Sequence, residues 1–174
     1  MYLTNVVCSG NVCCSIDLRE MCYRLVNTRY HPTLFPGLIW QHRTIGGNCL
    51  LFSNGKIQCQ GKATSLREGL IRLRRYARVL QTLGLPVRLT EAKVMTASAF
   101  HILSTSLDLE SFVKERQLVY EPELFPTATF RVEGVTFSCF RNGKIVITGI
   151  RTLSDINRIV NPTLVELELY TIQT

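Results

Sequence analysis

The stretch YEPELFP (120–126) repeats five letters of the stretch YHPTLFP (30–36), which lies earlier in the chain. The shared letters are a tyrosine, a leucine, a phenylalanine and two prolines. The matched phenylalanines, Phe35 and Phe125, stand 90 residues apart. Such a repeated apolar stretch serves either the packing of a repeated structural unit or a binding surface that is built from two copies of that unit.

A second pair of stretches indicates a duplication. FSNGKIQCQGKAT (52–64) and FRNGKIVITGIRT (140–152) agree at phenylalanine, at Asn-Gly-Lys-Ile, at glycine and at threonine. Their offset is 88 residues, so a two-residue deletion lies between Phe125 and Phe140. Because both pairs occur in the same order at nearly the same spacing, we infer a tandem duplication of a unit of about 85–90 residues. The first repeat is then 1–86 and the second is 87–174, and together they form one domain.

Composition restricts the possible partners. The 174-residue chain has 46% hydrophobic residues and a formal net charge of +7, and a basic domain of this size favours nucleic acid or acidic protein surfaces. The seven cysteines and three histidines show no zinc-ligand spacing. No apolar run reaches membrane-spanning length, and no cationic segment of a signal peptide precedes the start. We expect reduced core cysteines, no metal or cofactor, and no membrane partner.

Local signals in the first repeat predict a strand, a short helix, three strands and a long helix. Asp17 and Glu20 form a capping pair for the short helix. Asn54-Gly55 predicts a hairpin turn, because both residues tolerate positive φ. The expected elements are a strand in 4–16, a helix near 18–27, strands in 37–43, 48–53 and 56–61, and a helix in 65–84.

The long helix has clear signals at both ends. Ser65 and Glu68 form a capping box, and Gly84 suits the position just beyond the last turn. Apolar residues recur at helical spacing on one face, and arginines lie largely on the other, where a solvated face and a docking surface are equally good interpretations. The apolar residues are Leu66, Leu70, Leu73, Ala77 and Leu80, and the arginines are Arg67, Arg74, Arg75 and Arg78.

The second repeat shows the same order of signals. We expect a strand near 87–98, a helix near 108–116, strands around the Asn142-Gly143 turn, and a last helix near 153–160 that Pro162 ends or kinks. The fold class is thus α+β, with two tandem strand–helix–strands–helix units. Two such units can join into one curved antiparallel sheet that has its helices on the convex face and leaves the other face open.

These motifs together resemble the core domain of the TATA-box-binding protein family. YEPELFP resembles the family's second-repeat loop, RRYARVLQTLG (74–84) its basic first-repeat helix, and LFSNGKIQCQG (51–61) and CFRNGKIVITG (139–149) its two signature hairpins. The similarity runs from about Thr4 to Pro162. The resemblance implies a saddle whose concave sheet binds the minor groove of DNA and bends it.

The resemblance also implies which residues bind DNA. Each of the two loops called stirrups carries a phenylalanine pair that wedges between base steps, and a wedge of this kind offsets the cost of unstacking by the larger surface that the bend buries. The floor is the part of the concave sheet face that contacts base edges, and the family has an asparagine there in each repeat. Asn5 and Val7 match floor positions of the first repeat, and Thr96 stands where the second repeat usually has its asparagine. The wedge pairs are Phe35 with Phe52 and Phe125 with Phe140; the other matches are Val146 and Thr148 in the floor and Lys56, Lys144 and Arg131 at phosphates, where we also expect Arg43.

Several positions depart from the family pattern. Ser98 is the mate of Val7, Gln58 the mate of Val146 and Gln60 the mate of Thr148, so that part of the floor that distinguishes A·T from G·C is rewritten. The departures leave the DNA-bending architecture intact and put the preference for TATA sequences in question. The remaining departures are Leu34 and Gln41 at arginine positions and Asn54 and Asn142 at serine positions.

The resemblance implies protein partners as well. Glu121, Glu123 and Leu124 match the residues that dock transcription factor IIB. The basic helix, with Arg67, Arg74, Arg75 and Arg78, matches a surface for transcription factor IIA and regulators, and QHRTIGG (41–47) is taken as the first stirrup, which differs from the family. A nuclear protein, or one at a site of viral transcription if a virus encodes it, is expected.

The sequence is compatible with three functions. The first is a divergent initiation factor that bends promoter DNA and recruits a factor-IIB-like partner. The second is a protein-interaction platform or decoy of the same fold that has lost sequence-specific DNA binding. The third, an enzyme on the open sheet face, has little support, because no nucleophile motif, phosphate loop or metal cluster is visible.

Overall fold

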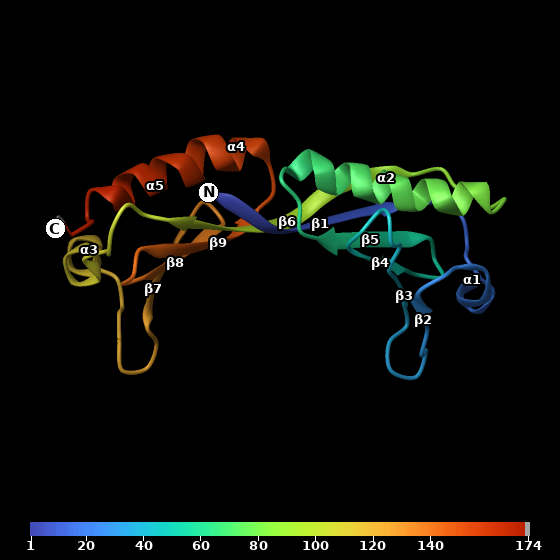
Figure 1. Cartoon of the computed structure of the whole chain (residues 1–174), viewed down its shortest axis with the longest axis horizontal. Coiled ribbons are helices and arrows are strands. Elements are labelled where there is room, and N and C mark those ends of the chain that lie inside the picture. The colour runs from blue at the N-terminus through green and yellow to red at the C-terminus, as the bar shows by residue number, and fades with distance from the viewer. Residues whose placement is uncertain (173–174) are drawn as a thin grey trace. The chain divides into compact units, whose positions relative to one another are not determined.

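A computed structural model describes residues 1–172 of the chain, which divide into two compact units (Figure 1). We call Asn5–Met95 the first-repeat unit, and Met1–Thr4 together with the chain from Thr96 onward the second-repeat unit. Strands β1 (Tyr2–Asn11) and β6 (Thr90–Ile102) each have residues in both units. The repeat boundary after residue 86 stays a prediction about the duplication.

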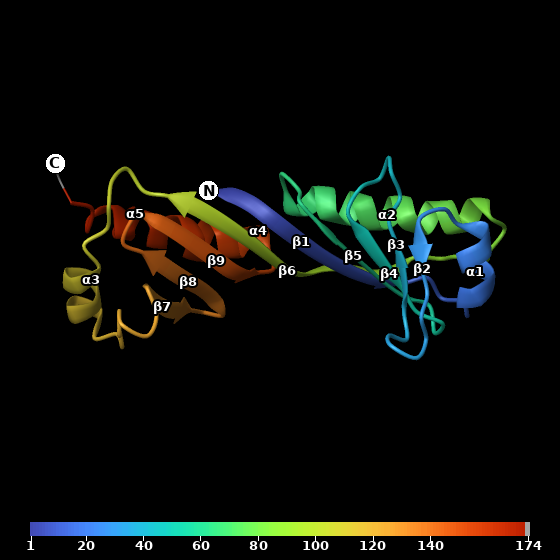
Figure 2. The ribbon, with the colours of Figure 1, turned by 60° about the horizontal axis from the view of Figure 1, so that its bottom comes forward.

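Each unit has an antiparallel sheet with helices on one face, which confirms the α+β class (Figures 1 and 2). The first-repeat unit has the strand order β2-β3-β4-β5-β1, and the second-repeat unit has the order β6-β9-β8-β7. The first contains β2 (Thr28–Arg29), β3 (Leu38–Trp40), β4 (Asn48–Leu51), β5 (Lys56–Gly61), α1 (Leu18–Arg24) and α2 (Leu66–Thr82). The second contains β7 (Thr127–Val132), β8 (Val135–Phe140), β9 (Lys144–Ile150), α3 (Leu109–Arg116), α4 (Leu153–Asp155), a π-helical segment (Ile156–Val160) and α5 (Asn161–Glu168).

Strand alternation separates a buried sheet face from an open one in each unit. On β1, Val6 and Cys8 are fully buried toward the helices, and Val7 between them is half-buried on the other side. On β8, Phe137 and Cys139 are likewise buried and Ser138 is not. Since side chains of a strand alternate with a period of two, the side of each sheet away from its helices forms an open face.

Helix α2 begins and ends where its sequence predicts, although its capping box forms only in part. Ser65 caps it by accepting from the Glu68 N–H at 3.2 Å, but the Glu68 carboxylate accepts from Thr64 rather than from Ser65, so only half of the capping box forms. Gly84, at φ +89°, donates to Gln81, and the next residue donates to Leu80, which together make a Schellman ending.

The buried face of α2 differs in part from the expected stripe. Leu73, Ala77 and Leu80 are buried as predicted, whereas Leu66 and Leu70 are only half-buried. Gly69, Arg72 and Tyr76 complete the buried face. Gly69 is needed because a Cβ there would come within 2.5 Å of Val6 on β1. The close approach of α2 to the sheet is therefore set by a residue without a side chain.

Other expected boundaries also change. Helix α1 ends at Arg24 rather than near residue 27, and the last helical segment continues to Glu168 rather than ending near residue 160. Pro162 lies in the first turn of α5, where its missing N–H is tolerated. In the preceding π-helical segment (Ile156–Val160), which ends with the Asn161 N–H donating to Ile156, the hydrogen bonds span five residues and widen the helix ahead of the proline ring. The helix thus passes the proline by a local change of hydrogen-bond pattern.

Candidate nucleic-acid interface

The floor of the open face in the first-repeat unit is polar. The pairing of β1 with β5 sets Val7 opposite Gln60, Ser9 opposite Gln58 and Asn11 opposite Lys56. Asn5 shares the face of Val7, because Val6 between them points into the core. A hollow of about 380 Å³ opens over this floor and is lined by residues that include Ser9, Asn11, Phe52, Lys56, Gln58 and Lys93.

The second-repeat unit has the same register with different chemistry. Ser98 lies opposite Thr148, Phe100 opposite Val146 and Ile102 opposite Lys144. A β-bulge between Ala97 and Ser98 shifts the alternation, and Thr96, just before it, is exposed. Three matched pairs of floor positions therefore occupy the same places in their own sheets: Val7 with Ser98, Gln58 with Val146, and Gln60 with Thr148.

Phe100 is a floor residue that sequence reasoning missed. Its ring stacks on the exposed Tyr2 ring with centroids 5.4 Å apart and planes inclined by 28°. The ammonium nitrogen of Lys144 lies 5.8 Å from the centre of the Phe100 ring. The sequence offered one signal for this position, since Phe100 is two residues after Ser98 and should share its face of the strand. That face could be identified only from the pairing of β6 with β9.

The wedge phenylalanines of the first-repeat unit meet as a pair. Phe35, in the loop 31–37, and Phe52, just after β4, are half-buried, with ring centroids 5.9 Å apart and planes inclined by 67°. Gly37 makes room for them, since a Cβ at this position would come within 2.7 Å of Phe35 and 3.0 Å of Phe52. The φ angle of Gly37 is not positive, so the backbone does not require a glycine here. The space that the two rings need explains the glycine.

The matched phenylalanines of the second-repeat unit do not meet in the same way. Phe125 is 64% exposed, and no ring contact joins it to the half-buried Phe140 within residues 1–172. The loop backbone is not the cause, because the Phe125 N–H donates to Glu121 at 2.9 Å just as the Phe35 N–H donates to His31 at 3.0 Å. Both loops hold their phenylalanine with the same local turn.

Thr127 accounts for the difference between the two pairs. It occupies the place of Gly37 and pairs directly with Phe140 across the β7–β8 ladder. Only 7% of its surface is exposed. Its hydroxyl oxygen has no hydrogen-bond partner among the described residues. A side chain thus fills the space that the Phe35–Phe52 pair uses in the other unit, and Phe125 stays outside.

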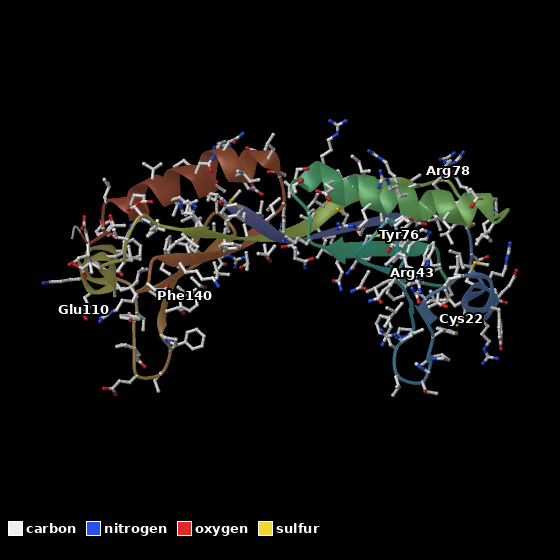
Figure 3. The ribbon with its side chains drawn as sticks, in the orientation of Figure 1. Cys22, Arg43, Tyr76, Arg78, Glu110 and Phe140 are labelled. Carbon is white, nitrogen blue, oxygen red and sulfur yellow. The ribbon has the colours of Figure 1, made fainter. Side chains whose placement is uncertain are left out.

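The cationic side chains fall into two groups. Lys56, Lys144 and Arg131 are exposed on strands of the open faces: Lys56 lines the hollow with Phe52, Lys144 lies over the Phe100 ring, and Arg131 lies toward the β7–β8 turn. Arg43 lies apart from them: it lines a groove of about 360 Å³ with residues of α1 and α2, including Arg24 and Val79. Figure 3 shows Arg43 below α2, near the turn between β3 and β4.

The prediction that QHRTIGG (41–47) is the first stirrup is wrong. QHRTIGG (41–47) is the turn between β3 and β4, and it is tied to α2 because the Tyr76 hydroxyl accepts from the His42 N–H at 3.1 Å and donates to Gly46 at 2.9 Å. The loop that matches the second stirrup is 31–37, which carries Phe35. The two-residue deletion falls in this turn, since β7 and β8 are joined more tightly through Glu133 and Gly134.

The residues matched to protein partners lie on exposed surfaces. Glu121, Glu123 and Leu124 are exposed in the loop before β7, where Leu124 is 78% exposed. Four of the five arginines of α2 (Arg67, Arg74, Arg75 and Arg78) are exposed on its outer side, as Figure 3 shows for Arg78, while Tyr76 faces the sheet. A groove of about 400 Å³ on this side is lined by Arg74, Arg75, Arg78 and neighbouring apolar residues.

Four of the seven cysteines are core residues, whereas Cys13 is exposed and Cys14 and Cys22 are half-buried. Cys8, Cys49, Cys59 and Cys139 are buried, and burial raises the pKa of the Cys8 thiol to about 11 and that of Cys139 to about 12. The Cys8 and Cys139 thiols are therefore protonated at neutral pH and are poor nucleophiles. In residues 1–172 no group of three or more His, Cys, Asp or Glu side chains is arranged to hold a metal ion. No helix in the same residues is both long and apolar enough to span a bilayer.

Comparisons with known proteins agree with this geometry. The family model described as "Transcription factor TFIID (or TATA-binding protein, TBP)" matches residues 1–83 and 91–169. TATA box-binding protein-like 2 of Rattus norvegicus is 37% identical over 158 residues, which cover 88% of this chain and 46% of that protein. TATA-box-binding protein of Xenopus tropicalis is 33% identical over 158 residues, with 88% and 53% covered.

A solved structure shows the same fold. Methanococcus jannaschii TBP superimposes with a TM-score of 0.79 at 29% identity, covering 97% of this chain and 98% of that one. The chain spans about half the length of the curated relatives it matches. Since the family model matches nearly all of the chain and the relatives agree along it, the chain belongs to the TATA-binding protein family, a family of transcription factors rather than of enzymes.

Proposed function

We propose that this protein binds duplex DNA in the minor groove through the open faces of its two units and bends it. The observation that carries the proposal is the repeated layout of the two faces. Each has floor positions in the same register, a lysine at the same place (Lys56 or Lys144) and two phenylalanines beyond the floor. Lysines neutralise phosphates, and apolar rings unstack a base step so that the bent duplex covers more protein surface.

The proposed kinks come from the phenylalanines. Phe125 offers an exposed ring, and Phe35 with Phe52 offers a preformed ring pair. A ring that is already outside the core can enter a base step without unfolding its surroundings. Flexible pyrimidine–purine steps should be preferred at the kinks, because they deform at the lowest cost.

The proposal includes protein partners. Glu121, Glu123 and Leu124 form an exposed acidic and apolar loop that suits a basic, factor-IIB-like protein. The arginines of α2 suit an acidic partner such as a factor-IIA-like protein or a regulator. Such an initiation factor acts where transcription occurs, in the nucleus or at a site of viral transcription.

A second function is favoured by one observation. Phe100 and Tyr2 occupy part of the open face in the second-repeat unit, and glutamines occupy the floor of the first. A face filled in this way also suits a platform or decoy that binds transcription factors without recognising a TATA sequence.

Selection from random duplexes, followed by bending measurements on the selected duplexes, separates the two functions. The bend can be read by energy transfer between dyes on the duplex ends. Lys56→Glu with Lys144→Glu should abolish binding, whereas Arg75→Glu with Arg78→Glu makes the same charge change on the helix side and should leave most of it. An unbent duplex with wild-type protein would support the platform, and equal loss in both variants would show non-specific attraction only.

A further inference from the structure

We propose that the first-repeat unit accepts a G·C base pair over its floor, whereas the second-repeat unit is restricted to A·T. This inference rests on the proposed binding to the minor groove and names the base pairs that each unit takes. The carrying observation is that two floors of identical register have opposite chemistry: Gln58 with Ser9 in one, and Val146 with Phe100 in the other.

The chemistry of the minor groove makes this difference readable. A·T and T·A pairs present only acceptors there, while a G·C pair adds the N2 amino group of guanine, which is a donor that projects into the groove. A protein floor that covers guanine must offer this group an acceptor and some space. A donor that is buried without a partner destabilises the complex.

The floor of the first-repeat unit meets both requirements. Gln58 and Gln60 are half-buried, and neither side-chain amide makes a hydrogen bond to another group among residues 1–172. An amide can accept from guanine N2 through its oxygen or donate to adenine N3 and thymine O2 through its nitrogen. The small Ser9 side chain opposite Gln58 leaves the hollow of about 380 Å³ open beside Gln58.

The floor of the second-repeat unit meets neither requirement at the same place. Val146 offers no acceptor, and Phe100 directly opposite it fills the position that Ser9 leaves open. The Phe100 ring contacts the Tyr2 ring, with centroids 5.4 Å apart, and the Lys144 ammonium lies 5.8 Å from its centre. A guanine amino group over this pair would lose its water and gain no partner, whereas an A·T pair presents no such donor.

Inosine provides the test, because it pairs with cytosine like guanine but lacks the N2 amino group. Duplexes selected by the wild-type protein should contain A·T pairs alone in one half of the site and admit G·C in the other. In the restricted half, placing G·C should weaken binding roughly tenfold and I·C should restore it, as expected for one unpaired donor. In the tolerant half, G·C and I·C should bind within a factor of about two.

Two reciprocal variants assign the halves to the units. Gln58→Val should make the tolerant half discriminate against G·C relative to I·C by roughly tenfold, read as the ratio of the two affinities of the same variant. Val146→Gln with Phe100→Ser should remove the discrimination in the restricted half. A thermal melt followed by circular dichroism reports that each variant is folded.

Three results would overturn the inference. Equal penalties for guanine in both halves with wild-type protein would contradict it, as would a Gln58→Val variant whose preference is unchanged. If the wild-type protein binds no duplex, including the all-A·T one, the proposed DNA-binding function fails, and this inference fails with it. A protein that binds and bends A·T duplexes but shows equal penalties would overturn the inference alone.

Discussion

The substitution Phe125→Ala tests whether the exposed ring of the second-repeat unit serves DNA rather than the core. Phe125 is 64% exposed, so about a third of its side chain is buried. Full burial of such a side chain is worth about 1.5–3 kcal/mol, so the free energy of unfolding should fall by roughly 0.5–1 kcal/mol. For a chain of this size, Tm should fall by roughly 1–4 °C.

Phe137→Ala is the matched control in the same unit. Phe137 is fully buried on β8, and its ring stacks on Phe130 with centroids 5.2 Å apart. Its loss should cost about 3–5 kcal/mol, which corresponds to a fall in Tm of roughly 6–20 °C. The contrast between the two variants separates a ring that is used on a ligand from a ring that holds the core.

The functional half of the test is DNA bending. Unstacking a base step costs a few kcal/mol, which the tighter wrap of the duplex offsets. Removing Phe125, alone or with Phe140→Ala, should therefore reduce the bend angle and the affinity together, as read by energy transfer and by titration. Leu153→Ala, which removes a 67% exposed apolar side chain from the start of α4, should change neither. A large fall in Tm with bending intact would refute the wedge assignment and favour the interaction platform.

Four further predictions concern the surface, the turn and the helix caps. Lys144→Ala should flatten the log–log salt dependence of DNA binding by roughly one unit, since one phosphate contact is lost; an unchanged slope would remove it from the phosphate contacts. Glu121→Arg with Glu123→Arg should abolish pull-down of a factor-IIB-like protein while bending persists, because reversed charge repels a basic partner; unchanged recruitment would contradict the docking role. Gly37→Ala should separate the ring pair that lies within 3.0 Å of the added Cβ and weaken the kink at that step, as reported by 2-aminopurine fluorescence; an unchanged signal would count against the steric role. Asp155→Asn should lower Tm at neutral pH, because hydrogen bonds at the helix start outweigh burial and lower the pKa of Asp155; this contribution is present above the ordinary pKa and is lost as pH falls through the lowered one, so a difference in Tm that persists in acid would contradict it.

Local signals in the sequence determined the repeat, the family and the ends of several elements. Ser65 and Gly84 begin and end α2 as expected, because caps depend on a few neighbouring backbone groups. The Asn-Gly turns form hairpins in both units, although only Gly55 and Gly143 take positive φ and each asparagine instead accepts from a lysine N–H at 3.1 Å. The α+β class followed from the order of these elements.

Contacts between distant segments decided the rest. The pairing of β6 with β9 places Phe100 in the floor. A β-bulge between Ala97 and Ser98 shifts the alternation of side chains along β6, and the sequence does not show where that shift occurs.

The difference between the two wedges is also a tertiary property. Phe35 and Phe125 stand in matching stretches with the same local turn, and the sequence predicts equal roles for them. The structure distinguishes them through the residue two positions later, because Gly37 leaves space for a ring pair and Thr127 fills it. Local chemistry therefore determined where each phenylalanine is presented, and side-chain volume across the β7–β8 ladder determined which of them meets its mate.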